Sequence, residues 1–222
     1  MSRLRPLLVV LALAIVSAAQ APPPLAISTD SVPKTTPRQD YLFELAATGG
    51  TAPLTWTISK GVLPPGITLD RATGRLAGTA LAIGEFPFTV AVTDGSKPPR
   101  TATRDLVLRV VVALTVEWKQ YPRAENNNSI RGSVVVTNGA DDPMDLTLIA
   151  VAVNDVGKAY ALGYQHFTLA ADSLSPELDL GFTLPAGTYI VHVDAVAEVP
   201  AKNVIHRARL QTQNSYTVTG VP

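Results

Sequence analysis

The chain has 222 residues, and its 18 Lys and Arg balance its 18 Asp and Glu, so the formal net charge is zero. Neither sign of charge forms long runs, which argues against a surface for nucleic acid or for an anionic membrane. The length suits one large domain or two small ones, each able to bury its own core, and two sandwiches of about 100 residues fit best.

The N-terminus has the layout of a secretory signal peptide. Arg3 and Arg5 precede an apolar run at 7–16 and small residues at 17–19, so we expect a signal peptide over residues 1–19. An uncleaved anchor is the alternative, although a membrane span needs about 20 apolar residues. We therefore expect a secreted or envelope-associated protein, periplasmic or extracellular, whose mature chain does not insert into a membrane. The chain has no cysteine, so neither disulfides nor a lipid-modified cysteine are expected.

The first sandwich is predicted over residues 25–112, after a proline-rich spacer at 20–24. Apolar side chains alternate with polar ones over residues 41–48, which is the period of a half-buried strand. The next strand carries Leu54, Trp56 and Ile58 on one face. This spacing places the indole of Trp56 in the core, and a ligand-binding platform is the alternative.

Prolines and glycines divide the rest of this half into short strands. The Leu-Pro-Pro-Gly run at 63–66 predicts a corner or a sheet edge, because proline has no N–H to donate. The stretch 70–74 predicts a turn. Further strands are expected at 67–69, 75–77, 86–93 and 105–112, and no stretch has helical periodicity.

Several spaced motifs of this half resemble one protein family. They are Leu54-Thr55-Trp56, Leu-Pro-Pro-Gly-Ile-Thr-Leu-Asp at 63–70, Thr-Gly-Arg-Leu-Ala-Gly-Thr at 73–79, Gly84-Glu85-Phe86 and Phe-Thr-Val-Ala-Val-Thr-Asp at 88–94. They are similar to the bacterial immunoglobulin-like family He_PIG, which is related to the dystroglycan-type cadherin-like domains. The resemblance covers about residues 25–112. It implies an Ig-like β-sandwich of the kind that serves as a spacer or adhesion module in surface and secreted proteins.

The second half, residues 113–222, follows almost without a linker and is predicted to form another immunoglobulin-like sandwich. Leu114, Val116 and Trp118 alternate with polar residues. Further strands are expected at 129–137, 144–154, 158–169, 177–184, 187–198 and 204–213. The run 182–194 also resembles the penultimate hairpin of bacterial adhesion-type immunoglobulin-like repeats. The predicted fold is thus all-β, with two tandem immunoglobulin-like sandwiches after a signal peptide.

The cadherin relationship implies calcium as a ligand, with Asp70 and Asp94 as the candidate metal ligands. A calcium ion needs six to eight oxygen ligands. Ala72 stands where the cadherin motif has an acidic residue, and the junction 108–114 contains no carboxylate. Both aspartates are therefore more consistent with turn residues. No cofactor is expected, and calcium is kept as the alternative.

The remaining polar residues do not add up to a catalytic site. His192 and Asp194 share one strand face and would begin a metal or general-base site, but no third ligand or nucleophile accompanies them. His166 and His206 are interpreted as structural residues. The sequence has no nucleophile elbow and no phosphate-binding glycine loop. We therefore do not expect an enzyme.

Two surface features carry weaker signals. The sequon at Asn127-Asn128-Ser129 is interpreted as a solvated hairpin tip. Four tyrosines would form a carbohydrate- or peptide-binding patch only if they cluster in space; they are Tyr121, Tyr160, Tyr164 and Tyr216.

The sequence as a whole predicts a non-enzymatic binding or scaffolding protein. It would contact a protein or a glycan at the cell surface through loops or an exposed strand edge. The alternatives are a rigid structural spacer, a carbohydrate-binding module and a calcium-binding cadherin-like adhesion domain. The short apolar junction favours the spacer among these, because it should restrict bending between the domains.

Overall fold

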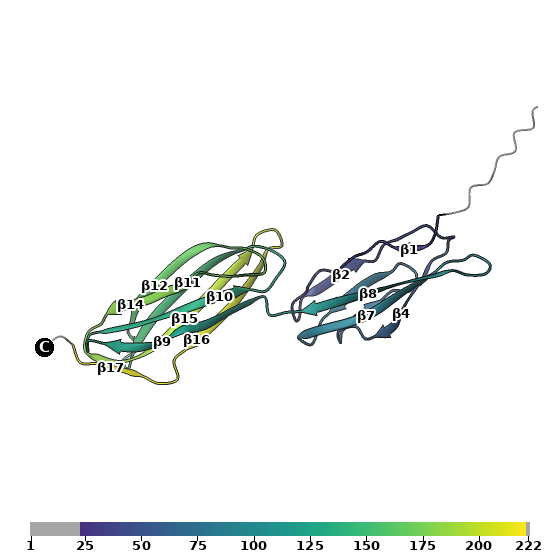
Figure 1. The fold of residues 1–222 in the computed structure, drawn as a ribbon. Helices are drawn as coiled ribbons and strands as arrows, with labels where there is room; N and C mark the ends of the chain where they lie inside the picture. Colours follow the sequence, from purple (N-terminus) through teal and green to yellow (C-terminus); the bar gives the residue numbers. More distant parts are fainter. Residues whose placement is uncertain (1–22, 221–222) are drawn as a thin grey trace, which may run out of the picture.

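The computed structural model describes residues 23–220, which form two β-sandwiches arranged end to end (Figure 1). We call strands β1–β8 the N-terminal sandwich and strands β9–β17 the C-terminal sandwich. Residues 23–220 contain strands, turns and loops but no helix, so the all-β prediction is confirmed. It follows that no helix in this range could cross a membrane. The predicted signal peptide lies outside the described residues.

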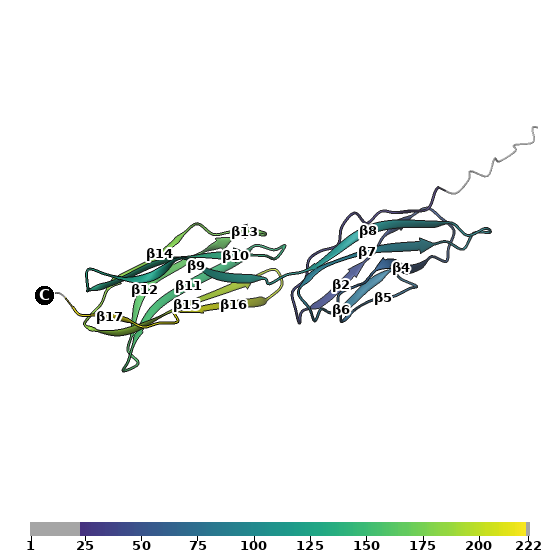
Figure 2. The same ribbon diagram turned by 60° about the horizontal axis from the view of Figure 1, so that its bottom comes forward.

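The N-terminal sandwich packs two three-stranded antiparallel sheets around one core (Figure 2). One sheet has the order β2-β6-β5 and the other β4-β7-β8, while β1 and β3 form a small extra pair. Buried side chains from both sheets, among them Trp56, Leu76 and Leu108, fill the interior. The strands are β1 (Ala26–Ile27), β2 (Asp40–Glu44), β3 (Ala47–Thr48), β4 (Thr55–Gly61), β5 (Ile67–Leu69), β6 (Arg75–Thr79), β7 (Gly84–Thr93) and β8 (Thr101–Val110).

The central strand β7 contains a proline, and its neighbour β4 is irregular near its end. Pro87 cannot donate a ladder hydrogen bond, so a strand beside it needs a bulge or an interruption. The β4–β7 register shifts between Ile58 and Lys60, close to this point. Gly61 then follows with a φ of 73°, and a Cβ there would lie 2.2 Å from the carbonyl oxygen of Pro87. β4 ends at Gly61, opposite Phe88, and so does not pair with Pro87.

The strand predicted over residues 41–48 is split in the structure. β2 ends at Glu44. The Leu45 N–H still donates to the carbonyl oxygen of Gly74, directly before β6 (3.0 Å), but the Ala46 N–H turns away to Thr29 Oγ1 (2.8 Å). The chain then pairs with β1 instead of β6. The strand predicted over 105–112 starts earlier, at Thr101, because β8 pairs along the whole length of β7.

The C-terminal sandwich has longer strands and a larger core. A four-stranded sheet holds β10 between β9 and β14, with β13 beside it, and a five-stranded sheet has the order β12-β11-β15-β16, with β17 on β15. Leu146, Leu148 and Val193 are fully buried between the two sheets. The strands are β9 (Leu114–Glu125), β10 (Ser129–Asn138), β11 (Met144–Asn154), β12 (Ala159–Leu169), β13 (Ser173–Leu174), β14 (Leu178–Thr183), β15 (Gly187–Val199), β16 (Val204–Gln211) and β17 (Tyr216–Val218).

The two sandwiches have separate cores and are joined by the short segment 111–113. The N-terminal buried cluster ends at Val110 and the C-terminal cluster begins at Ala113. Thr35 lies beside the end of β8, where its N–H donates to the carbonyl oxygen of Arg109 (3.0 Å) and its carbonyl oxygen accepts from the Val111 N–H (2.9 Å). The loop before β2 is therefore fixed against the start of the connecting segment.

Candidate functional site at the domain junction

Lys34 links the two sandwiches through two carboxylates. Its backbone N–H donates to Asp141 Oδ2 (2.8 Å), and its ammonium lies 3.5 Å from Asp141 Oδ1 and also contacts Asp172 Oδ1. The Lys34 side chain is only 17% exposed, while those of Asp141 and Asp172 are 41% and 56% exposed. The hydrogen bond to Asp172 raises the pKa of Lys34, so the ammonium stays charged at neutral pH. We call these three residues the Lys34 clamp.

The C-terminal sandwich also holds the connecting segment directly. The Gly139 N–H donates to the carbonyl oxygen of Ala113 (3.0 Å). A Cβ at Gly139 would lie 2.7 Å from the carbonyl oxygen of Val112, so only glycine allows this approach. Because the same loop continues to Asp141, the clamp and the connecting segment are fastened to one short stretch of chain.

A groove of about 340 Å³ opens beside the clamp, between the two sandwiches. Tyr41 from β2 and Val204 and His206 from β16 contribute to its lining. Burial raises the pKa of the Tyr41 hydroxyl and lowers the pKa of His206, so both side chains are neutral at pH 7. At the rim, Lys202 pairs with Asp142. The groove thus combines neutral rings with the paired charges of the clamp and of Lys202 and Asp142.

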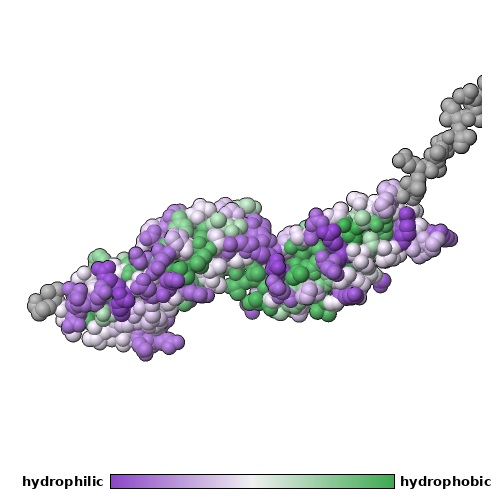
Figure 3. All heavy atoms as spheres, in the orientation of Figure 1, coloured by the Kyte–Doolittle hydropathy of each residue, from purple (hydrophilic) through white to green (hydrophobic). Residues whose placement is uncertain are grey.

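Three large apolar side chains are exposed around the corner at residues 63–66. Val62, Leu81 and Ile83 are 69%, 69% and 60% exposed, and the Leu81 N–H donates to the carbonyl oxygen of Pro65 (2.9 Å). β7 begins beside the end of β8, which places these residues at the junction end of the N-terminal sandwich. Figure 3 shows apolar surface on this part of the molecule. We call Val62, Leu81 and Ile83 the corner patch.

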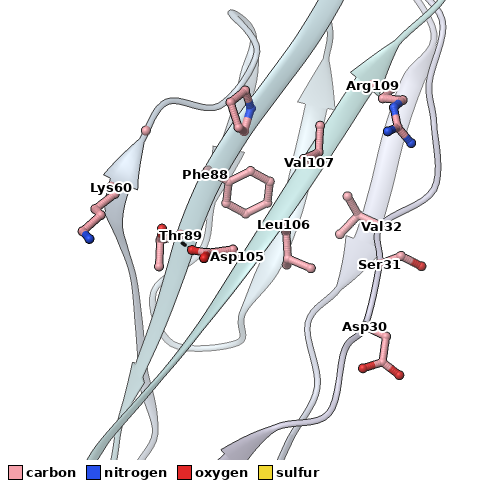
Figure 4. Close-up of a pocket in the computed structure, with 12 residues that line it drawn as sticks. Asp30, Ser31, Val32, Lys60, Phe88, Thr89, Asp105, Leu106, Val107 and Arg109 are labelled. Atoms are coloured by element: carbon pink, nitrogen blue, oxygen red, sulfur yellow. Dashed lines mark hydrogen bonds between the residues drawn. The ribbon is translucent and has the colours of Figure 1, made fainter.

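A second hollow, of about 490 Å³, lies on the N-terminal sandwich (Figure 4). The loop carrying Asp30 forms one wall, and β7 and β8 form the other. Both carboxylates at its rim already have partners: Asp30 pairs with Arg104, and Asp105 accepts a hydrogen bond from Thr89 Oγ1 (2.6 Å). The hollow is a shallow surface feature whose acidic groups are engaged by neighbouring side chains.

Asp70 closes the turn between β5 and β6. Its Oδ1 accepts hydrogen bonds from the backbone N–H groups of Ala72 (2.8 Å) and Thr73 (3.0 Å). The bonds from Thr73 and Ala72 lower the pKa of Asp70. This candidate calcium ligand therefore uses one carboxylate oxygen to stabilise its own turn.

Asp94 is buried at the end of β7, and its carboxylate stabilises the β7–β8 turn. Its Oδ1 accepts from the Arg100 N–H (2.8 Å) and from Ser96 Oγ, and its Oδ2 accepts from the Thr51 N–H (3.1 Å) and from Arg100 Nε (3.0 Å). The Ser96 hydroxyl and the Arg100 N–H hold the pKa of this carboxyl far below its usual range. Since both oxygens face donors from the chain, a cation would have to displace them.

The other polar candidates lie on the outer face of the five-stranded sheet. Asp194 forms an ion pair with Arg209 on the neighbouring strand, so its charge is already compensated beside His192. His166 shares a hydrogen bond with Thr147 Oγ1 (3.0 Å). Across residues 23–220, no three His, Cys, Asp or Glu side chains are grouped as metal ligands would be.

The four tyrosines do not gather into one patch. Tyr121 packs edge-on against Trp118, with ring centroids 5.6 Å apart, and lies next to Tyr216. Tyr160 packs instead against the buried Tyr189 (5.8 Å). Tyr164 stands on β12 opposite Ile149 of β11. A carbohydrate-binding role therefore stays a prediction from sequence, as does a glycan at the Asn127 sequon in the β9–β10 turn.

Sequence analysis missed the residues of the Lys34 clamp. Carboxylates were sought only within the connecting segment itself, whereas Asp141 and Asp172 reach the junction from the β10–β11 and β12–β13 loops. The paired aspartates at 141 and 142, in a predicted turn directly before a strand, were the available signal. Nothing local in the sequence marks Lys34 as their partner.

Comparison with known proteins addresses the first half of the chain. Residues 21–111 match the model of the He_PIG family, described as "Putative Ig domain". The N-terminal sandwich is an Ig-like domain of this family. The resemblance inferred from the spaced motifs is thus confirmed for the He_PIG domain. No curated protein matches the chain.

Matches to solved structures are of low identity and low structural similarity. Mouse cadherin-23 EC22–24 is 19% identical over 88% of this chain and 62% of that one, with a TM-score of 0.36. Protocadherin gammaB7 EC3–6 is 12% identical over 87% and 52%, with a TM-score of 0.37. A "putative alpha-galactosidase/melibiase" from Bacteroides fragilis is 22% identical over 40% of this chain and 18% of that one, with a TM-score of 0.35. All three TM-scores are low, so the assignment rests on the family match.

Proposed function

We propose that the chain is a non-enzymatic binding and scaffolding protein of the cell envelope or the extracellular space. After removal of the predicted signal peptide, residues 25–112 and 113–222 would act as two Ig-like domains, and the partner would be a protein. The family match supports this class of function, because Ig-like sandwiches recur as interaction modules whose specificity lies in surface features.

The corner patch is the observation that supports protein binding most directly. Scattered single apolar residues are normal on protein surfaces, whereas grouped, highly exposed ones mark interaction sites. Val62, Leu81 and Ile83 gather around a corner whose two prolines leave few backbone donors. An apolar protein surface would gain burial of all three side chains, while an anionic or strongly hydrated ligand would gain nothing from them.

The experiment compares patch variants with a matched control in the full mature chain. We expect the double variant Leu81→Glu/Ile83→Glu to lose the cross-linked envelope protein that the wild type captures, with an unchanged melting temperature. Val156→Glu is the control, because Val156 is 80% exposed at the tip of the β11–β12 hairpin in the other sandwich. Capture of the same protein by the double variant would contradict patch binding, and hydrolysis of a glycoside, ester or peptide panel by the wild type would contradict the non-enzymatic assignment.

A rigid spacer is the second candidate, favoured by the junction. The connecting segment is hydrogen-bonded to Thr35 on one side and to Gly139 on the other, which restricts rotation between the sandwiches. A wild-type chain that captures no partner in the same experiment would favour this candidate over the first.

A further inference from the structure

The Lys34 clamp has a distinctive position in the molecule. Among residues 23–220, Lys34 makes the side-chain hydrogen bonds and ion pairs that cross from one sandwich to the other. Its backbone N–H and its ammonium both contact the Asp141 carboxylate, so the lysine is held at its backbone and at the end of its side chain. The loop that carries it is itself fixed to the end of β8 through Thr35.

The clamp is a second connection beside the covalent one. Two bodies joined only through residues 111–113 could rotate about the backbone dihedrals of that segment. The contacts from Lys34 to Asp141 and Asp172, on two loops of the C-terminal sandwich, oppose such rotation. We propose that the Lys34 clamp is an electrostatic lock that sets the angle between the two sandwiches, and that loss of its charges turns residues 111–113 into a hinge.

The two carboxylates of the clamp reach solvent and make the lock reversible, while the Lys34 side chain is only 17% exposed. Asp172 is 56% exposed, and ion pairs that reach solvent are weak and are screened by salt. The Debye length falls from about 10 Å at 0.1 M to about 3 Å at 1 M ionic strength. The lock should therefore hold at low salt and loosen at high salt, while the cores of the two sandwiches are unaffected.

The lock also acts on the interdomain groove. The two walls of the groove come from different sandwiches: Lys34 and Tyr41 line it from the N-terminal sandwich, and Asp141 and His206 from the C-terminal sandwich. Rotation about residues 111–113 would separate these walls. Opening of the lock would thus change the shape of the groove without changing either sandwich. The groove would then have two shapes, one with the lock closed and one with it open.

Distances between spin labels test the lock directly. The chain has no cysteine, so Lys97→Cys and Asn214→Cys place one label on an exposed loop of each sandwich. We expect a narrow distance distribution in the wild type at low salt that broadens at least twofold in 1 M NaCl. Lys34→Ala and Asp141→Asn/Asp172→Asn should be at least twice as broad at both salt concentrations.

Arg104→Ala is the matched control, because Arg104 pairs with Asp30 inside the N-terminal sandwich. It should keep the narrow, salt-sensitive distribution of the wild type. Thermal unfolding of every variant shows whether the sandwiches remain folded, and the asparagine pair keeps side-chain oxygens while removing charge. A narrow distribution in Lys34→Ala, or equal broadening in Arg104→Ala, would overturn the lock. The result is independent of partner binding, so it separates this proposal from the proposed function.

Discussion

Replacing Gly74 by alanine should strongly destabilise the N-terminal sandwich. Gly74 has a φ of 76°, and a Cβ there would lie 2.7 Å from Cε2 and Nε1 of Trp56. Trp56 is 3% exposed and cannot move aside without disturbing the core. The left-handed backbone costs an L-residue about 1–2 kcal/mol, and overpacking of a filled core costs about 1–3 kcal/mol. Together they amount to about 2–5 kcal/mol, a large part of the about 5–15 kcal/mol that stabilises a typical domain.

Denaturant unfolding can follow each sandwich separately, since each contains one tryptophan. Trp56 reports on the N-terminal sandwich in a Trp118→Phe background, and Trp118 reports on the C-terminal sandwich when Trp56 is replaced. Gly157→Ala is the control, because Gly157 has a φ of 80° but a Cβ there would meet no other atom within 4 Å; only the backbone cost of about 1–2 kcal/mol is expected at this position. A loss for Gly74→Ala no greater than that for Gly157→Ala would refute the packing argument.

Two further predictions concern the aspartates proposed as calcium ligands. Millimolar calcium should leave both unfolding midpoints unchanged in differential scanning calorimetry, because Asp94 has donors on both oxygens and Asp70 closes its own turn; a clear upward shift would show that a calcium site exists. Since the pKa of Asp94 is lowered in the folded state, its stabilising contribution should be complete above the ordinary carboxyl pKa of about 4 and should decline as the pH falls below it. Asp94→Asn should melt at a lower temperature than the wild type at pH 7, and the difference should shrink toward about pH 2; a constant difference would contradict the assigned ionisation.

Local pattern was enough to predict most strands of the chain. Alternation within a strand fixes which side chains face the core, and this placed Trp56 inside, where it is buried against Gly74. The Leu-Pro-Pro-Gly corner was also evident from sequence, because proline cannot join a ladder. Strand ends were less predictable. β2 stops near Glu44 because the Ala46 N–H turns to Thr29 Oγ1, 17 residues earlier in the sequence.

The candidate site was harder to predict than the fold for the same reason. The turn role of Asp70 depends on residues two and three positions away, so it could be inferred locally. Asp94 also binds Thr51, 43 residues earlier. Lys34 is 107 residues from Asp141 and 138 from Asp172. These pairings follow from how distant segments are placed against one another, which alternation within strands does not specify.

The positive charge at the junction comes from Lys34, and this bears both on calcium binding and on the proposed lock. Carboxylates from two loops of the C-terminal sandwich converge there, an arrangement that would attract a divalent cation if no positive charge lay between them. Lys34 instead brings an ammonium from the N-terminal sandwich into contact with both. A metal ion would have to displace this ammonium and break the backbone hydrogen bond at Asp141, and two carboxylates fall well short of the six to eight oxygens that calcium takes. Because the cation belongs to the chain, the angle between the sandwiches should respond to the ionic strength of the surroundings and not to the concentration of a particular ion.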